Sequence, residues 1–429
     1  MAQKKILIPG GNLADWALVN AAHRLGLYVI TSGTDKAGPA HRFSDEYVCA
    51  DYSDREAMLR LAEEKRIDYM CSNANDFGMI STAYVCEKLG LPGHDSYETA
   101  LTLHTKDRLK PLFKRLGIHS PITEIFDDRS KALKYLRSAD RKLIVKPADN
   151  VGSYGVSSPT TEDEMVESVD FAFSKSKTKR IVIEPFIEGF YCNASVMIIG
   201  QEVKAFLSQA QFQYPGVYRL PDTSPYPYYD HTTGKLQPAL YEEDFGPKIV
   251  GDFNKLAREL HLVDGKFQCE MMITPEREPY IFDVHRRMSG MNEPWADWDF
   301  TDEIHWEEWI VRSECGMDLS GFPVGFRPKR YLHFRDIFAP KDGIIRRVEF
   351  DEYLTSHIYP KYPGKNLVLH NLFVTDHQRD PIFEWKQRSG NYVPFFSFDN
   401  KEEATRIALD NDEFYSHIRF EYGDTRVDV

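Results

Sequence analysis

The sequence has few cysteines, and none stands in a pattern through which cysteine performs chemistry. The 429 residues include six cysteines that lie far apart, without a CxxC pair or the Cys/His spacing of a zinc site. Isolated cysteines in a chain of this length are expected to be small buried hydrophobes in a reducing compartment. A Ser-His-Asp or Cys-His signature is also missing, which argues against catalysis through a protein nucleophile.

Basic tracts and long apolar runs are absent as well. The net charge is −13 and no basic tract stands out, which argues against sequence-independent binding of nucleic acid. Met1–Lys5 lacks the apolar run of a signal peptide, and no stretch approaches the roughly 18 apolar residues of a membrane span. We therefore expect a cytoplasmic protein with small-molecule partners and with no nucleic-acid or membrane partner.

What is present is an ordinary globular composition, 42% hydrophobic and 28% charged, in a chain too long for a single core. Strands alternate with helices over the first hundred residues, which is typical of a doubly wound parallel sheet in an α/β domain. The expected elements are strands at Ile6–Ile8, Tyr28–Ile30 and Asp68–Cys71, and helices at Asp15–Leu25, Asp54–Lys65 and Met79–Leu89. The first domain is accordingly assigned to residues 1–104.

Two polar turns follow strands of this domain. Gly10-Gly11-Asn12 suggests a dinucleotide site, but the GxGxxG motif is incomplete and no acidic residue ends the second strand. A Rossmann redox enzyme is therefore an open alternative that lacks the sequence fingerprint of that class. The open strand ends near 73–76 can equally hold a small substrate. Asn75 and Asp76 are therefore candidate substrate contacts.

A second domain is expected at 105–325, with a small lobe at about 121–187, and a small α+β domain at 326–429. The elements expected in these two domains are strands at Leu143–Pro147, Arg180–Glu184 and His417–Phe420, and helices at 105–117, Glu162–Ser174 and Lys401–Leu409. Residues 208–247 are rich in proline and tyrosine and are predicted to form a functional loop without regular structure. Tyr218 and Arg219 are its candidate substrate contacts, although its aromatic residues can equally pack the loop down.

Lys146 ends a buried strand and is followed by a glycine-rich turn. Gly152, Ser153 and Gly155 lie in that turn, which can bring an ammonium and backbone N–H groups to a polyphosphate. The next buried strand ends in Glu184 and leaves the sheet, where the backbone can meet an adenine edge. The alternative is an ordinary strand exit with Glu184 in a surface ion pair.

A hairpin further along carries the densest set of chemical groups. Glu270 lies on its first strand, and Asp283, His285 and Arg287 alternate along the second, so that the last three project on one side. Two carboxylates on adjacent strands suit Mg²⁺ held against phosphates, and an arginine can grip an anionic intermediate. The alternative is the polar face of an edge hairpin in water.

These signals, together with Lys106, occur in the order and spacing of the ATP-grasp fold, and the chain resembles that superfamily over nearly its whole length. The architecture resembles that of carboxylate–amine ligases and biotin-carboxylase-like enzymes, with a pre-ATP-grasp domain, a two-lobed α+β ATP-grasp domain and a C-terminal domain. The resemblance implies that Lys106 and Lys146 contact ATP phosphates and that Gly152–Gly155 forms the phosphate loop. It further implies an adenine hinge at Glu184–Ile187, with recognition by the backbones of Phe186 and Ile187, Mg²⁺ or Mn²⁺ on Glu270 and Asp283, and an intermediate-stabilising Arg287.

The chain departs from the family pattern at two positions. Asp283-x-His285-x-Arg287 stands where the family has Glu-x-Asn-x-Arg, so an imidazole takes the third metal-facing position. The ribose-binding acid of the family falls at Tyr191, whose hydroxyl could hydrogen-bond ribose instead.

The resemblance implies an ADP-forming ligase. It would activate a small carboxylic acid, an amino acid or a sugar acid, as an acyl phosphate and couple it to an amine to form an amide. Homodimers are common in the resembled families. Two alternatives stay open: an ATP-dependent carboxylase of the biotin-carboxylase or purine type, and a non-catalytic nucleotide-binding regulatory protein. The absence of a Met-Lys-Met motif disfavours a self-contained biotin carboxylase.

Overall fold

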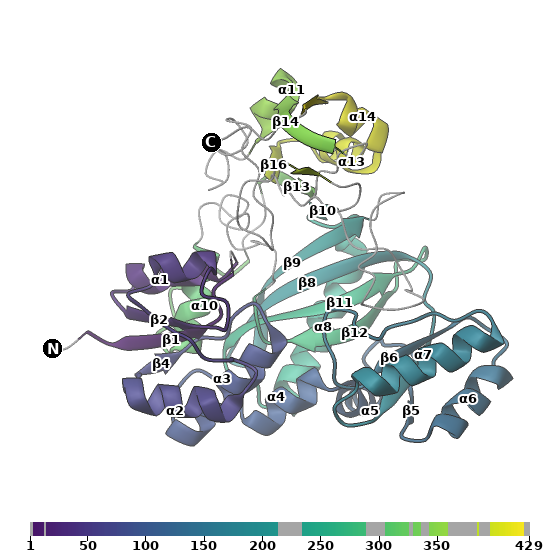
Figure 1. Cartoon of the computed structure of the whole chain (residues 1–429), viewed down its shortest axis with the longest axis horizontal. Coiled ribbons are helices and arrows are strands. Elements are labelled where there is room, and N and C mark those ends of the chain that lie inside the picture. Colours follow the sequence, from purple (N-terminus) through teal and green to yellow (C-terminus); the bar gives the residue numbers. More distant parts are fainter. Residues whose placement is uncertain are drawn as a thin grey trace.

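The computed structural model describes residues 3–12, 14–212, 234–288, 305–325, 329–335, 343–358, 384–385 and 395–423. The N-terminal sheet and its helices lie on one side of a large central sheet, and a small lobe that contains β6 and α7 lies on the other side (Figure 1). A C-terminal layer with α13 and α14 lies at the far end of the central sheet (Figure 1). Within the described ranges, no helix is long and apolar enough to cross a membrane.

The first sheet is parallel and doubly wound, as predicted. Its strands lie in the order β3-β2-β1-β4, and their bounds are Lys5–Pro9 (β1), Tyr28–Ser32 (β2), Glu46–Val48 (β3) and Tyr69–Met70 (β4). Ile6 and Ile8 pack on one face with helix α1 (Asp15–Arg24), and Leu7 packs on the other face with helices α2 (Arg55–Lys65) and α3 (Asp76–Leu89). Alternate strand residues thus bury two separate apolar layers.

Helix α3 begins earlier than the sequence indicated. Asn75 caps it, because its Oδ1 accepts a hydrogen bond from Phe77 N at 2.9 Å, and Asp76 is the first helical residue. The predicted start at Met79 was wrong because the polar residues before it form the cap and first turn. This shift places Asp76 at the amino end of a helix, at the edge of the sheet.

The small lobe follows helices α4 (Tyr97–His104) and α5 (Lys106–Leu116). Its antiparallel sheet has the order β5-β7-β6, with bounds Glu124–Phe126 (β5), Leu143–Pro147 (β6) and Ile181–Pro185 (β7). Helices α6 (Arg129–Ser138) and α7 (Glu162–Lys175) share its apolar core. A capping box of Thr161 and Glu164 fixes the start of α7 where the sequence predicted it.

The central sheet has seven strands in the order β12-β11-β8-β9-β10-β13-β16. Their bounds are Phe190–Ile199 (β8), Glu202–Phe212 (β9), Gly234–Gln237 (β10), Gly265–Ile273 (β11), Pro279–His285 (β12), Tyr331–Arg335 (β13) and Phe395–Phe398 (β16). Helix α8 (Glu242–Glu259) buries Phe245 and Phe253 in the same core as Phe267 of β11. This packing holds the β11–β12 hairpin at one edge of the sheet.

The prediction that residues 208–247 lack regular structure was wrong at both ends. β9 extends to Phe212, β10 lies inside the sheet between β9 and β13, and α8 begins at Glu242 despite Gly246 and Pro247. Non-local strand pairing forms β10, which its short sequence does not signal. Tyr218 and Arg219 lie outside the described residues, so their expected roles stay predictions.

The C-terminal part contains a second small sheet. Its strands have the order β15-β14-β17, with bounds Gly343–Phe350 (β14), Glu384–Trp385 (β15) and Ile418–Gly423 (β17), and its helices are α11 (Glu352–His357), α13 (Lys401–Leu409) and α14 (Asn411–Ser416). β13 and β16 continue the central sheet, so the boundary expected at residue 326 falls within one hydrogen-bonded sheet. Helix α10 (Trp306–Glu314) lies in the same apolar core as α1, which joins the first domain to the second.

Candidate active site

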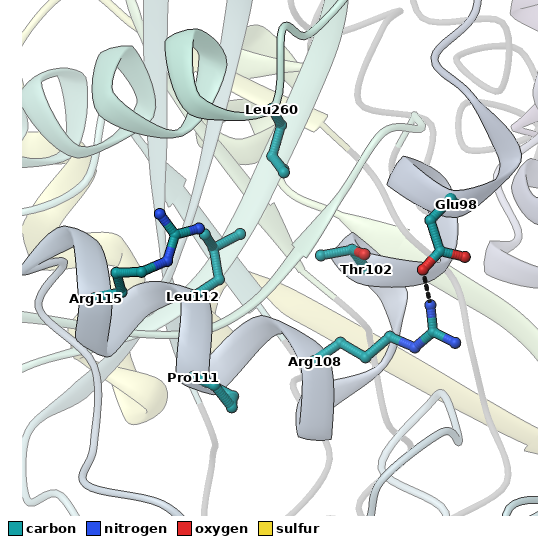
Figure 2. Close-up of a pocket in the computed structure, with 7 residues that line it drawn as sticks. All are labelled: Glu98, Thr102, Arg108, Pro111, Leu112, Arg115 and Leu260. Carbon is teal, nitrogen blue, oxygen red and sulfur yellow. Dashed lines mark hydrogen bonds and ion pairs between the residues drawn. The ribbon is translucent and has the colours of Figure 1, made fainter.

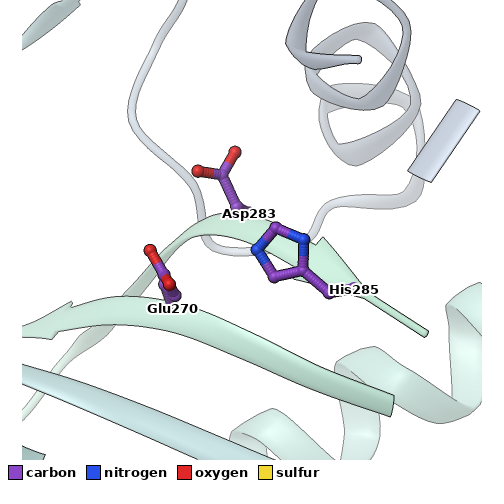
Figure 3. Close-up of side chains that lie close together, drawn as sticks. All are labelled: Glu270, Asp283 and His285. Atoms are coloured by element: carbon purple, nitrogen blue, oxygen red, sulfur yellow. The ribbon is translucent and has the colours of Figure 1, made fainter. Parts of the chain in front are cut away.

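The β11–β12 hairpin brings three potential metal ligands together. Glu270 and Asp283 are paired directly across the two strands, and His285 lies opposite Gln268. One ligand atom from each of Glu270, Asp283 and His285 lies within 4.8 Å of the others, and Figure 3 shows the three side chains on the same side of the hairpin. β12 is an edge strand, as the alternative interpretation required, but Asp283 and His285 are mostly buried rather than solvated.

Lys106 reaches this cluster from the first turn of α5. Its Nζ lies 3.1 Å from Asp283 Oδ1, and its backbone N–H donates to Ala148 O in the small lobe. Burial alone would lower the pKa of Lys106, but the charge of Asp283 outweighs it and raises the pKa above its usual value. A permanently charged ammonium therefore lies beside the carboxylates.

The Glu184 carboxylate is buried between two lysines. Its Oε2 lies 2.7 Å from Lys146 Nζ, its Oε1 lies 2.9 Å from Lys110 Nζ, and Thr123 Oγ1 donates to Oε1 at 2.7 Å. Burial would raise the pKa of Glu184, but Lys110 and Lys146 lower it to about 2. The surface ion pair considered for Glu184 was therefore wrong, since the side chain is 1% exposed.

Sequence reasoning missed Lys110. It lies one helical turn after Lys106 on α5, and its Nζ also donates to Ser120 Oγ at 2.9 Å. The i, i+4 spacing of the two lysines was visible in the sequence and puts both on one helix face. Nothing local indicated that this face is buried.

The turn after β6 has the backbone of an anion-binding loop. Gly152, Ser153 and Gly155 all have positive φ values, 62°, 60° and 85°. Successive residues of this kind can turn backbone N–H groups toward one side, which suits a phosphate. This geometry agrees with the phosphate loop that the resemblance implies.

An apolar patch lies beside the lysines and carboxylates. Tyr191, Met272 and Phe282 form a small cluster against which Ile187 packs, and Lys146 Nζ lies 4.8 Å from the centroid of the Phe282 ring. Phe186 lies further out, with Lys142 Nζ 3.8 Å from its ring centroid. A flat, largely apolar ring such as adenine would suit this patch. Tyr191 Oη donates to Glu270 Oε2, so its hydroxyl is engaged with a candidate metal ligand.

Arg287 contacts the first domain. Its Nε donates to Asp76 Oδ1 and its Nη2 to Asp76 Oδ2 at 3.4 Å, while His285 Nδ1 lies 3.0 Å from the same Oδ1. Burial would raise the pKa of Asp76, but Arg287 and His285 hold it well below the usual range. Asp76 thus joins the hairpin cluster, whereas Asn75 serves as the cap of α3.

The donor set fits a hard divalent cation. The two carboxylates supply the oxygen ligands that Mg²⁺ and Mn²⁺ prefer, whereas the imidazole nitrogen is a ligand better suited to softer transition metals. The lysines around them supply the positive charge that a polyphosphate requires.

The Gly10–Asn12 turn of the first domain is filled by protein. A Cβ at Gly11 would come within 2.0 Å of His41 Nε2, and His41 Nδ1 lies 2.9 Å from Thr31 Oγ1. His41 belongs to the short helix η1 (Pro39–Phe43), which folds over the turn. The space that a dinucleotide would need is therefore occupied by the imidazole of His41, and the glycines of the turn allow this close packing.

A separate pocket of about 500 Å³ opens on the outer side of α5 (Figure 2). Its apolar walls carry two arginines that are both paired, Arg108 with Glu98 and Arg115 with Glu259. None of its lining residues belongs to the hairpin cluster. The lining residues are Glu98, Thr102, Arg108, Pro111, Leu112, Arg115 and Leu260.

Sequence comparison connects part of the chain to one family. Residues 104–216 match the family model of the ATP-grasp (A) domain of phosphoribosylglycinamide synthetase. The chain is also 25% identical over 166 residues to the phosphoribosylamine–glycine ligase of Helicobacter pylori, which covers 38% of this chain and 37% of that protein. The aligned region thus spans well under two thirds of the relative.

Structure comparison extends the likeness to the whole fold. The L-amino acid ligase from Bacillus licheniformis has a TM-score of 0.75 at 19% identity, covering 99% of this chain and 100% of that one. Phosphoribosylglycinamide synthetase from Anaerococcus prevotii has a TM-score of 0.72 at 16% identity, covering 98% and 100%. The biotin carboxylase domain of the Hydrogenobacter thermophilus 2-oxoglutarate carboxylase, a dimer with MgADP and bicarbonate, has a TM-score of 0.70 at 15% identity, covering 98% and 91%. The chain therefore shares its overall fold with these ligases and with the biotin carboxylase domain, and residues 104–216 match an ATP-grasp domain.

Proposed function

We propose that this protein is an ADP-forming carboxylate–amine ligase. The observation that carries the proposal is the convergence of Lys106, Lys146, Glu270, Asp283 and Arg287 between the two lobes and the first domain. The carboxylate of a small acid would attack the γ-phosphorus of ATP, with ADP as the leaving group, to give an acyl phosphate. An amine would then attack the acyl carbon and expel phosphate, which forms the amide.

Positioning and charge account for the catalysis, because neither step needs a protein nucleophile. Lys146 and Lys106 are proposed to hold the ATP phosphates, under the turn at Gly152–Gly155. The backbones of Phe186 and Ile187 are proposed to recognise adenine beside the patch of Tyr191 and Phe282. Lys106 and Lys146 are both paired with carboxylates. These ion pairs keep the two lysines extended toward the site before nucleotide binds.

Glu270, Asp283 and His285 are proposed to hold Mg²⁺ or Mn²⁺. A divalent cation bound there would neutralise phosphate charge during transfer. Arg287 is proposed to stabilise the negative charge of the acyl phosphate and of the tetrahedral species, since its guanidinium fork matches two oxygens.

A carboxylase is the second candidate, because the fold resembles the Hydrogenobacter biotin carboxylase domain nearly as well as the L-amino acid ligase, with TM-scores of 0.70 and 0.75. In that case bicarbonate would be the acid that is phosphorylated. The reaction of the site residues would be the same up to the acyl phosphate, so only substrate dependence separates the two candidates.

The test measures ADP release from ATP and Mg²⁺ with pools of amino acids, sugar acids and amines, and separately with bicarbonate. A ligase releases ADP only with both an acid and an amine, and ¹⁸O from a labelled carboxylate appears in the released phosphate. Bicarbonate-dependent release identifies a carboxylase instead. ATP binding measured by calorimetry, without ADP release in any pool, would overturn the ligase proposal in favour of a regulatory protein.

A further inference from the structure

Asp76 contributes to the hairpin cluster from a different domain. It is the first residue of α3 and is 4% exposed, and its carboxylate contacts both His285 and Arg287. Asp76 and Arg287 lie 211 positions apart in the chain. This carboxylate is therefore present only because the two domains are docked.

The loop that carries Asp76 is fixed from two sides. Ala74 N donates to Oδ1 of the buried Asp15 at 3.0 Å, and Ser72 N donates to the buried Glu314. Asn75 then caps α3. Hydrogen bonds from α1, α10 and the loop itself thus hold Asp76 at a defined position. A residue that positions other side chains has to be fixed in this way.

The two nitrogens of the His285 ring face different partners. Nδ1 lies 3.0 Å from Asp76 Oδ1, and the opposite ring nitrogen is turned toward Glu270 and Asp283 (Figure 3). Nδ1 makes no hydrogen bond at this distance, so the Asp76 carboxylate acts on the ring through its charge and its close contact rather than by accepting a hydrogen bond. The same carboxylate holds the guanidinium of Arg287 next to the ring.

We infer that Asp76 is a positioning residue for the metal site: its carboxylate holds Arg287 through two hydrogen bonds and lies against the His285 ring, which keeps the opposite ring nitrogen turned toward Glu270 and Asp283. The inference rests on the proposed metal role of His285. It adds that the first domain completes the site, so the hairpin alone holds a divalent cation less tightly than the docked protein does.

The experiment measures Mn²⁺ affinity of the full chain by electron paramagnetic resonance, with and without ADP. Asp76→Ala and Asp76→Asn are expected to weaken Mn²⁺ binding by roughly tenfold to a hundredfold, the usual effect of losing a partner of a ligating histidine. Asp95→Asn is the matched control, because Asp95 is also a buried first-domain carboxylate that binds a hairpin arginine, Arg286, at 2.7 Å, but it does not contact His285. The asparagine retains a side-chain oxygen that can accept a hydrogen bond from Arg286, so the domains are expected to stay docked in this variant. Its Mn²⁺ affinity is expected to stay within about twofold of the wild type.

A second readout reports the surroundings of the His285 ring. Long-range ¹H–¹⁵N spectra of histidine-labelled protein, with His285 assigned by its loss in His285→Gln, are expected to show the same ring signals in Asp95→Asn as in the wild type. In Asp76→Ala the ring signals of His285 are expected to shift, because the ring loses its contact with the carboxylate. Circular dichroism and thermal unfolding confirm that the variants are folded, and Asp76→Asn serves if the alanine variant is not.

The outcomes separate the inference from the function it rests on. If His285→Ala weakens Mn²⁺ binding but both Asp76 variants bind Mn²⁺ as tightly as the wild type and show its His285 ring signals, the role of Asp76 is wrong and the metal site stands. If His285→Ala leaves Mn²⁺ affinity unchanged, the metal role of His285 is wrong and the inference is overturned with it.

Discussion

At the scale of single residues, the site depends on charges that are buried together and compensate one another. Glu184 lies between Lys110 and Lys146, Asp283 lies beside Lys106, and Asp76 contacts Arg287. If one partner of such a pair is removed, the other is left as an uncompensated buried charge. A substitution at these positions therefore alters stability as well as ligand binding.

Lys146→Ala is expected to weaken ATP binding by tenfold or more and to lower the free energy of unfolding by about 2 kcal/mol. The loss of stability follows because Glu184 keeps only Lys110 as its cationic partner. Calorimetry with ATP and urea unfolding measure the two effects. Lys134→Ala is the control, since Lys134 is exposed on α6 of the same lobe. Equal ATP affinity in both variants would remove Lys146 from the phosphate site.

His94 is expected to make stability depend on pH. Burial, with a further contribution from Arg286, lowers the pKa of His94 to about 3, and the ring bonds Met70 O at 2.8 Å. The unfolded histidine titrates near 6.5, so between about pH 6.5 and 3 only the unfolded state takes up this proton and stability falls as the pH falls. The slope is about 1.4 kcal/mol for each pH unit.

Urea unfolding of the wild type and of His94→Gln at pH 7.5 and 5.5 measures this effect. The variant is expected to lose less stability than the wild type on going to the lower pH. His104, whose pKa burial lowers to about 4, remains in both proteins and leaves a residual slope. Identical losses in the two proteins would show that His94 is protonated in the folded state.

At the scale of elements, turns and helix ends place the functional groups. The first turn of α5 carries Lys106, the first turn of α3 carries Asp76, and the hairpin register sets Glu270 opposite Asp283. The turn after β6 also places functional groups, and its conformation depends on three residues with positive φ.

Gly155→Ala is expected to disturb this turn far more than Gly152→Ala. Both glycines have positive φ, which costs an alanine about 1–2 kcal/mol. A Cβ at Gly155 would also come within 2.6 Å of Pro147 Cγ, whereas a Cβ at Gly152 meets nothing closer than 3.6 Å. ATP affinity by calorimetry should therefore fall at least about tenfold more in Gly155→Ala, since 1.4 kcal/mol is sufficient for that factor. Equal affinities would exclude a role for the tight Pro147 contact.

At the scale of the whole molecule, the site exists where the first domain, the small lobe and the central sheet meet. Arg286 joins the hairpin to the first domain: its Nη1 lies 2.7 Å from Asp95 Oδ2, and the two side chains are 5% and 4% exposed. Its Nη2 donates to Gly93 O and Asp264 O.

Arg286→Ala is expected to lower the free energy of unfolding by roughly 3–5 kcal/mol, because Asp95 is left charged and buried. Arg277→Ala on the same hairpin removes an exposed pair with Asp244 and a contact with the ring of the exposed Tyr241, for which about 0–1 kcal/mol is expected. Urea unfolding measures both variants, and limited proteolysis should cut Arg286→Ala first between the domains. Similar stabilities would mean that the arginine does not hold the two domains together.

The sequence by itself determined the elements and the local chemistry of this protein. Alternating apolar residues in Ile6–Ile8, the capping residues of α7 and the strand-lysine-glycine order at Lys146 are local patterns, and the fold class that they predicted is confirmed. Strand periodicity, which is also local, predicted that Asp283 and His285 project on one side of the hairpin. The register that pairs Glu270 with Asp283 shifts between Glu270 and Met271, which strand periodicity does not predict.

Only the tertiary structure decided which charges meet. The Asp76 contacts with His285 and Arg287, the second lysine on Glu184, and the position of β10 inside the central sheet all join segments distant in sequence. The local sequence does not indicate such pairings, because the same ionisable residue can be either solvated or buried beside a partner. Docking of the domains buries these groups, and burial makes each partner necessary.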